Sequence, residues 1–402
     1  MNSDAIHQFV IDYFRLMYRY SLIPRYRLFS FVVARFSSNQ LKNFEQKTFD
    51  YFYARRLKLF HGNQQHMSNH LHSQLRSLLK TSSINNQLIH LNSTKDFSEN
   101  LSIEQLNDLL FFAYEHQIKL DLLTKRLIEC VDPVHKQSSP HLFVELVNLL
   151  VLHQQKYYDY QTKAPNKTLE NFLQTFELNL TTEQIKSIPL AELSLLCSAM
   201  YRLRMSLKNP QLLQSIGDCL IEDETKKHLA AVDKQNFIKI LTLSNYGKIE
   251  IANALANRFN QSFEQHLQSN LKSLSYEIVR MTMRIGLYFS MLRFYSERFF
   301  ANCLKLIELE ARTSTPSYRA KDTIQIMNTL IFMGYMKTYD KNYINLIKTF
   351  DQMNHFEGKP DRLLDVLAPL AMIGHFPEDL LQKLFTKDNL SRLKGKVYGW
   401  LK

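Results

Sequence analysis

The amino-acid sequence predicts an all-α fold, an α-solenoid of degenerate helix-pair repeats about 40 residues long. Its 402 residues are 45% hydrophobic, which is enough to bury a sizeable core. The 9 glycines and 10 prolines are too few for the many tight turns of all-β or Rossmann-type folds. From residue 101 onward, apolar residues recur at intervals of three and four, which is the spacing of one buried helix face.

Residues 1–36 have the composition of a mitochondrial targeting segment. Between Met17 and Glu45 the chain contains five Lys or Arg and no acidic residue, and Ser and apolar residues lie among them. Arg35 suits the arginine-minus-two pattern of presequence cleavage. Two aspartates interrupt the first sixteen residues, so Met17 is an alternative start to Met1. We expect a product in the mitochondrial matrix; an ordinary amphipathic first helix is the alternative.

Residues 37–100 are expected to hold an N-terminal helix followed by a polar linker rich in Asn, Ser, Gln and His. Four histidines in this linker are spaced so that some share a helix face: His61, His66, His70 and His72. No neighbouring Cys or Glu completes a ligand set, so a polar linker is favoured over a metal site. The four cysteines of the chain are far apart and form no C-x-x-C pair, which excludes a zinc ribbon.

Helix pairs are expected through residues 101–224 and 225–402, the N-terminal and C-terminal repeats. The pairs span residues 106–127, 189–220, 236–259, 275–307, 323–350 and 371–393. In the last four pairs a glycine is expected at or near the end of the first helix, in the turn between the helices, because glycine adopts the left-handed conformation without strain: Gly247, Gly286, Gly334 and Gly374. Three prolines mark helix starts: Pro189, Pro360 and Pro377.

One such pair cannot bury its apolar face alone, so neighbouring pairs are expected to stack into a solenoid with a long exposed surface. The variable spacing leaves an irregular globular helical domain as the alternative. No apolar run reaches the roughly 18 to 20 residues of a membrane span. The longest run, residues 142–152, is interrupted by Glu145.

The sequence contains no motif that indicates an enzyme or a cofactor. Phosphate loops, dinucleotide-binding glycine patterns, zinc-protease, hydrolase and kinase signatures are all missing from it. The acidic pair Glu222 and Asp223 is interpreted as a solvated helix end, because paired carboxylates without an organised neighbour are common on surfaces. We therefore expect no catalysis, no cofactor and no metal.

The net charge of +12 is concentrated at the two ends of the chain. Residues 1–60 contain ten Lys or Arg against four acidic residues, and residues 386–402 contain five against Asp388 alone. This balance suits an anionic partner such as nucleic acid, since neutralised phosphates release counterions. Solubility combined with a targeting segment is the alternative explanation.

Basic and aromatic side chains alternate on several predicted helices, a combination that binds single-stranded RNA. Arg280 and Arg284 are four residues apart, so both face one side of a helix and suit consecutive phosphates. The alternative is that the aromatic residues, Tyr201, Tyr288 and Tyr295 among them, fill the core. The candidate RNA contacts are Arg202, Arg204, Arg280, Arg284, Arg293, Arg392, Lys394 and Lys396.

Residues 363–393 resemble the second module of the Fas-activated serine/threonine kinase (FASTK-like) family. A helix there runs into a Phe-Pro break and a second helix with paired apolar residues follows; the matching positions are Leu367, Leu370, Phe376, Pro377, Leu380, Leu381, Phe385, Leu390 and Leu393. Residues 225–350 are similar to the first helical module of that family. The family usually ends in a RAP domain, and none is recognised before Lys402.

The resemblance implies a mitochondrial RNA-binding protein that acts in transcript processing, stability or translation, without kinase activity and without the RNA cleavage attributed to the RAP domain. It implies single-stranded mitochondrial RNA as the partner, together with other RNA-processing or ribosomal proteins. The alternative function is a protein-interaction scaffold in a mitochondrial assembly. An RNA-binding solenoid predicts exposed Arg, Lys and Tyr side chains on one surface, whereas a scaffold predicts exposed apolar patches.

Overall fold

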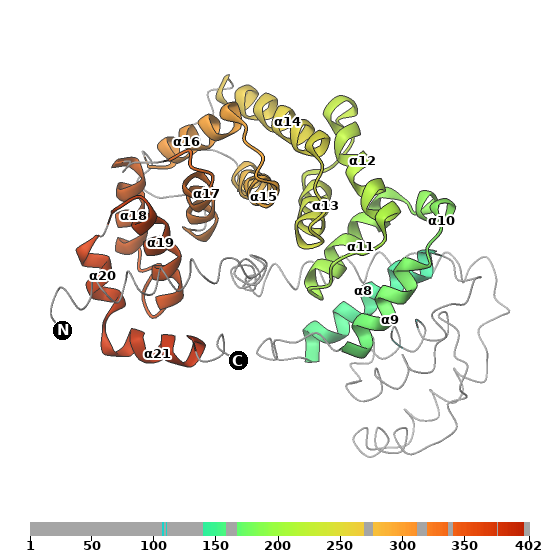
Figure 1. Cartoon of the computed structure of the whole chain (residues 1–402), viewed down its shortest axis with the longest axis horizontal. Helices are drawn as coiled ribbons and strands as arrows, with labels where there is room; N and C mark the ends of the chain where they lie inside the picture. The colour runs from blue at the N-terminus through green and yellow to red at the C-terminus, as the bar shows by residue number, and fades with distance from the viewer. Residues whose placement is uncertain are drawn as a thin grey trace, which may run out of the picture. The chain divides into compact units, whose positions relative to one another are not determined.

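Figure 1 shows the computed structural model of the chain. It describes Asn107, Leu110 and residues 140–157, 167–268, 276–311, 320–336, 341–375 and 377–397. This part of the chain is 80% helical, contains no strand and forms 14 helices that pack against their neighbours in sequence order. The prediction of an all-α helical repeat is therefore confirmed. The targeting segment, the linker histidines and most of the helix pair 106–127 lie outside the described residues.

The chain divides into two compact units, with Ile216 the last residue of the first and Gly217 the first described residue of the second. The N-terminal unit contains α8 (Pro140–Tyr157), α9 (Lys167–Leu178), α10 (Thr182–Ser187), α11 (Leu190–Arg202) and the start of α12 (Pro210–Lys226). The C-terminal unit contains the rest of α12, α13 (Ala231–Leu243), α14 (Ile249–Gln268), α15 (Tyr276–Leu292), α16 (Glu297–Ala311), α17 (Ala320–Phe332), α18 (Lys341–Gln352), α19 (Pro360–Met372), α20 (Glu378–Leu384) and α21 (Lys387–Val397).

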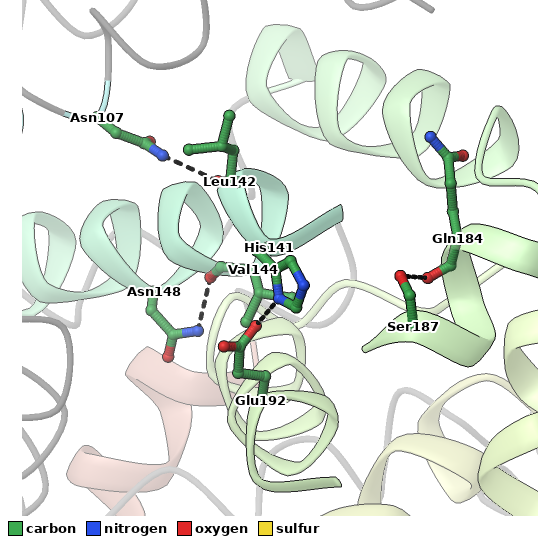
Figure 2. A network of polar contacts seen from close by, with 8 residues as sticks. All are labelled: Asn107, His141, Leu142, Val144, Asn148, Gln184, Ser187 and Glu192. Atoms are coloured by element: carbon green, nitrogen blue, oxygen red, sulfur yellow. Dashed lines mark hydrogen bonds and ion pairs between the residues drawn. The ribbon is translucent and has the colours of Figure 1, made fainter. Parts of the chain in front are cut away.

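Helix α8 is the centre of the N-terminal unit, because its residues 143–152 are all buried and it packs against α10 and α11. The rings of Phe143 and Phe176 stack with their centroids 4.4 Å apart, which joins α8 to α9. Figure 2 shows the polar contacts of the same region, where His141 Nδ1 lies 2.7 Å from the buried carboxylate of Glu192 on α11. This pair fixes the first turn of α8 against α11.

A buried carboxylate, Glu177, holds the end of α9 against the loop before α12. Its Oε1 accepts hydrogen bonds from the backbone N–H groups of Lys208 and Asn209, both at 2.6 Å. Asn209 donates back to the carbonyls of Glu177 and Leu180 and caps α12 by accepting from the N–H of Leu212. Burial raises the pKa of Glu177 more than these hydrogen bonds lower it. These contacts fix the end of the loop next to α12.

The C-terminal unit is built of two layers of helices (Figure 1). The odd-numbered helices α13, α15, α17 and α19 pack side by side in one layer, and α14, α16 and α18 pack side by side in the other. Contacts between α14 and α15 and between α16 and α17 join the layers. This is the arrangement expected for stacked helix pairs, in which each repeat buries its apolar face against the next one.

Small and polar side chains lie at the seams between neighbouring helices of one layer. A Cβ added to Gly286 in α15 would lie 3.0 Å from Thr329 Cγ2 in α17, so the missing side chain allows these helices to approach closely. Asn328 donates from Nδ2 to the carbonyl of Asp365, which links α17 to α19. In the second layer, Asn302 of α16 donates to Asn260 of α14 at 2.9 Å.

A left-handed residue directly follows each odd-numbered helix of the repeat, or lies one residue further on. These residues have φ between 54° and 76° and lie after α11, α13, α15, α17 and α19: Arg204, Asn245, Arg293, Gly334 and Gly374. The residue after each one donates its N–H to the carbonyl five residues earlier, at 2.9–3.0 Å. This is the Schellman motif, which satisfies carbonyls that a helix end otherwise leaves unpaired. Subtraction of the residue numbers gives a repeat of 41, 48, 41 and 40 residues.

The glycine prediction is confirmed at Gly334 and Gly374, which have φ of 71° and 76°. It is wrong at Gly286, because this residue lies inside α15 and serves helix packing, while Arg293 ends that helix. Gly247 lies in the turn between α13 and α14, as predicted, but the left-handed residue of this turn is Asn245, two residues earlier. All three prolines predicted to start helices do so: Pro189 and Pro377 precede α11 and α20, and Pro360 is the first residue of α19.

The acidic pair after Cys219 separates into two environments. Glu222 is exposed and pairs with Lys226, as predicted for a solvated helix end. Asp223 is buried, so the prediction is wrong for this residue: its Oδ2 lies 2.7 Å from Lys234 Nζ, and its Oδ1 accepts the N–H of Leu229. Burial alone raises the pKa of Asp223, but these hydrogen bonds with the Lys234 and Arg258 charges outweigh it and hold that pKa below its usual range. The cluster ties α12 to α13 and α14.

We expect Arg293→Gly to stabilise the fold by about 1 kcal/mol. Relief of the left-handed strain gains about 1–2 kcal/mol, and the greater freedom of glycine in the unfolded chain takes back about 0.4–1 kcal/mol. The measurement is the midpoint of urea unfolding. Arg293→Ala is the matched control, since it removes the guanidinium and keeps the strained backbone. An equal gain from Arg293→Ala would show that the charge, and not the backbone, is responsible.

Candidate nucleic-acid interface

One edge of the C-terminal unit consists of the turns that follow the odd-numbered helices. We call this surface the turn edge and define it as residues 244–248, 293–296, 333–336 and 373–375. The left-handed residues at its four turns, Asn245, Arg293, Gly334 and Gly374, are all exposed. The Schellman motif fixes the backbone here, so the side chains of each turn stand in equivalent places from one repeat to the next.

Each turn of the turn edge places an aromatic residue directly after the left-handed one. These residues are Tyr246, Phe294, Tyr335 and His375, and all are half-buried. Each is in the position that packs back on its own helix in a Schellman motif. The contact is resolved at Phe294, whose ring centroid lies 4.8 Å from that of Phe289. Each turn therefore keeps part of an aromatic residue accessible at the surface.

Cations accompany these rings in two turns. The exposed Lys248 holds its ammonium 5.6 Å from the centroid of the Tyr246 ring, within the range of a cation–π contact. The next turn, residues 293–296, contains the exposed Arg293 two residues before Tyr295. Two neighbouring repeats thus each combine an aromatic ring and a cation at the surface.

The most exposed aromatic residue of the turn edge is Tyr295, with 52% of its surface accessible. It belongs to a cluster with the buried Phe300 of α16 and with Tyr335, at centroid distances of 5.3 Å and 6.2 Å. Tyr295 donates its hydroxyl to Glu297 Oε2 at 2.6 Å. This hydrogen bond is the main reason that the pKa of Tyr295 rises to about 12. Two repeats contribute to the cluster, because Tyr295 follows α15 and Tyr335 follows α17.

The structure places two of the predicted RNA contacts at the equivalent turn of the N-terminal unit. Arg202 is the last residue of α11 and is half-buried. Arg204 is exposed and left-handed, with φ of 59°. Arg204 and Arg293 therefore hold the same position in their repeats, an equivalence that sequence spacing alone did not reveal.

The predicted pair on α15 differs in accessibility. Arg280 is half-buried, one helical turn before Arg284, as the sequence indicates. Only 6% of the surface of Arg284 is accessible, so a phosphate can reach its guanidinium only if neighbouring groups move. Arg284 belongs to a set of buried polar residues nine positions before the left-handed residue in three consecutive repeats: Asn236, Arg284 and Gln325.

The three C-terminal candidates lie on α21. Arg392 is exposed and donates from Nη1 to the carbonyl of Gly358 at 2.9 Å, which ties α21 to the loop after α18. Lys394 and Lys396 are also residues of α21, but their side chains lie outside the described part of the chain.

One aromatic and one basic residue near Arg293, Tyr288 and Arg298, make contacts within the fold. Tyr288 is fully buried, and its hydroxyl accepts the backbone N–H of Lys248, so the alternative prediction of a core residue is confirmed there. Arg298 forms a bidentate pair with Glu264 of α14, with Nη2 at 2.7 Å from both carboxylate oxygens. These contacts join α16 and α15 to the neighbouring α14.

Sequence reasoning missed the aromatic residues of the turns and the buried polar residues of the odd-numbered helices. The signal for the first was an aromatic residue directly after each helix-ending position, and it becomes visible only when the repeats are aligned on the left-handed residue. The second gave no such signal, because burial of Asn236 or Gln325 depends on packing against other parts of the fold.

Apolar side chains are also accessible at the ends of the odd-numbered helices. The residue two positions before the left-handed one is apolar in four consecutive repeats: Leu243, Met291, Phe332 and Met372. Phe332 and Met372 are exposed, with 49% and 55% of their surface accessible. This row lies beside the turn edge, at the ends of the same four helices.

Among the described helices, none is both long enough and apolar enough to cross a lipid bilayer. Comparison of this chain with protein-family models, with curated proteins and with solved structures gives no match. Any function therefore has to be inferred from the geometry of the chain itself.

We expect Arg284→Glu to lower the stability of the fold by at least about 3 kcal/mol, because it puts a carboxylate into a buried place that accommodates a cation. The measurement is the thermal unfolding midpoint of the full chain. Arg204→Glu is the matched control: it makes the same charge change at an exposed turn and should leave the midpoint nearly unchanged. Equal shifts in both variants would contradict the structural role of Arg284.

Proposed function

We propose that this chain is a mitochondrial RNA-binding protein of the FASTK-like kind, acting in post-transcriptional RNA metabolism, and that it binds single-stranded RNA along the turn edge. The observation that supports this most is the side-by-side placement of exposed cations and accessible aromatic rings in consecutive repeats. Single strands are bound by this combination, since cations follow the phosphates while rings stack on bases.

The left-handed arginines add a second argument. Glycine or asparagine occupies this position in three of the five repeats, and a longer side chain there costs backbone strain. Strained residues persist where the side chain is needed for function. Arg204 and Arg293 are both exposed, so their guanidinium groups are available to phosphates. Lys227, at the end of α12, is a left-handed cation outside this set, so strain alone does not identify a contact.

The salt dependence of RNA binding tests this proposal. We expect full-length protein to bind a fluorescein-labelled oligouridine, and the double variant Arg293→Gln, Lys248→Gln to bind it more weakly. Each lost phosphate contact should reduce the slope of log K against log salt by about 0.7. The measurement is fluorescence anisotropy at several salt concentrations.

The control for this experiment is the double variant Lys305→Gln, Lys348→Gln, which makes the same change of charge at exposed positions on α16 and α18. It should keep the wild-type slope. Equal slopes for both double variants would show that binding follows net charge and does not use the turn edge. Absence of binding by the wild type at low salt would overturn the RNA-binding function.

The accessible row of Leu243, Met291, Phe332 and Met372 favours a second function, a helical-repeat scaffold in a mitochondrial assembly. Exposed apolar rows of this kind are typical of protein interfaces. Mitochondrial RNA-processing or ribosomal proteins are the partners in this case. If the wild type binds no RNA, the scaffold becomes the better interpretation of the same surface.

Localisation is tested separately. We expect residues 1–36 fused to a fluorescent protein to enter mitochondria, because the segment is cationic and apolar. Replacement of Arg25, Arg27 and Arg35 by Glu should leave the fusion outside, since import requires positive charge. Imaging against a matrix marker is the measurement, and a fusion that stays outside mitochondria without any substitution would contradict the targeting role.

A further inference from the structure

The cluster around Tyr295 has features beyond those of a general RNA contact. The buried ring of Phe300 contacts the rings of Tyr295 and Tyr335, which belong to two consecutive repeats. The carboxylate of Glu297 lies beside the hydroxyls of both tyrosines. Gly334, the residue before Tyr335, is exposed, and a Cβ added to it would meet no atom within 4 Å apart from those of its chain neighbours. The cluster therefore combines an accessible ring and a hydrogen-bond acceptor next to an open turn.

From this geometry we infer a guanine-binding site: one guanine base of a single-stranded RNA stacks on Tyr295 and donates hydrogen bonds to Glu297. This inference rests on the proposed RNA-binding function and adds a base preference to it. Tyr295 supplies the stacking surface because more than half of its surface is accessible. Stacking on an exposed aromatic ring is available to every base, so it gives affinity without preference.

The carboxylate gives the preference. An ionised carboxylate is an acceptor only and takes about four hydrogen bonds, so the bond from Tyr295 leaves other positions of Glu297 open. Burial, followed by the charge of Glu297 and a hydrogen bond to it, raises the pKa of Tyr335, so the carboxylate acts on both tyrosines. Glu297 is exposed and is the first residue of α16.

Guanine is the base whose donors match this acceptor. Its Watson–Crick edge presents an N1–H and an exocyclic N–H side by side, so one carboxylate can accept both. Adenine and cytosine each present one amino donor beside a ring nitrogen that repels the carboxylate. Uracil presents one N–H between two carbonyl oxygens. Base edges of unstacked single strands are accessible to such recognition.

Anisotropy titrations of the full-length protein test the inference with uridine octamers that carry one central guanosine, inosine or adenosine. We expect the guanosine octamer to bind about tenfold more tightly than the adenosine octamer, the discrimination typical of a bidentate contact. Inosine lacks the exocyclic amino group and should fall between the two. Tyr295→Ala should weaken binding of the guanosine octamer by about tenfold through loss of stacking.

Glu297→Gln should abolish the preference for guanosine over adenosine while leaving binding of the all-uridine octamer intact. Glu250→Gln, at the start of α14, makes the same charge change at an exposed position and should keep the preference. This pair of variants tests the site even if Tyr295→Ala fails to fold.

The outcomes separate this inference from the function on which it rests. Binding of RNA without preference for guanosine, or a preference that survives in Glu297→Gln, overturns the guanine site and leaves the RNA-binding function standing. Absence of binding to every octamer at low salt overturns both. A preference lost in Glu297→Gln and kept in Glu250→Gln supports the guanine site.

Discussion

The backbone reversal at the end of each odd-numbered helix is the constraint on which the repeat depends. A left-handed residue there lets the next N–H reach the carbonyl five residues back, and the helix cannot continue past this bond. The chain must then turn toward the other layer at the same point in every copy. Three of the four intervals between reversals are 40 or 41 residues, and the 48-residue interval contains α14, which at 20 residues is the longest described helix. The repeat is therefore defined by where helices stop.

This constraint also explains why little sequence identity is needed between copies. Once the helix ends are fixed, neighbouring helices meet in a constant register. The contacts between two neighbouring helices then depend only on the residues of those two helices. Gly286 against Thr329 and Asn328 against Asp365 solve the same problem with different chemistry. Stability in such an array is close to a sum of contacts between nearest neighbours, so each seam can vary independently.

The parts of the fold that follow from local chemistry were predictable, and those that follow from tertiary packing were not. The helix pairs were predicted from the spacing of apolar residues, and the left-handed conformation of Gly334 from the backbone conformations open to glycine. Gly286 misled because glycine also serves close helix contact, and the turn at Arg293 was invisible because arginine rarely adopts that conformation. Arg284 and Asp223 looked like surface charges because sequence carries no measure of their burial. The aromatic residues of the turn edge could not be recognised as equivalent until the structure showed which residue ends each helix.

The distribution of charge on the turn edge bears on which form of RNA the proposed function would require. Arg293 and Lys248 place exposed cations in two consecutive turns, whereas Glu297, beside Tyr295, is an acceptor for a base. In the proposed binding mode, phosphate contacts and base preference would thus arise from different side chains of these turns. A flexible single strand can satisfy both, because its backbone can follow one turn while a base rotates onto the next. A rigid duplex cannot, since its bases are already stacked and paired. The separation of the two kinds of contact is therefore an argument for single-stranded RNA.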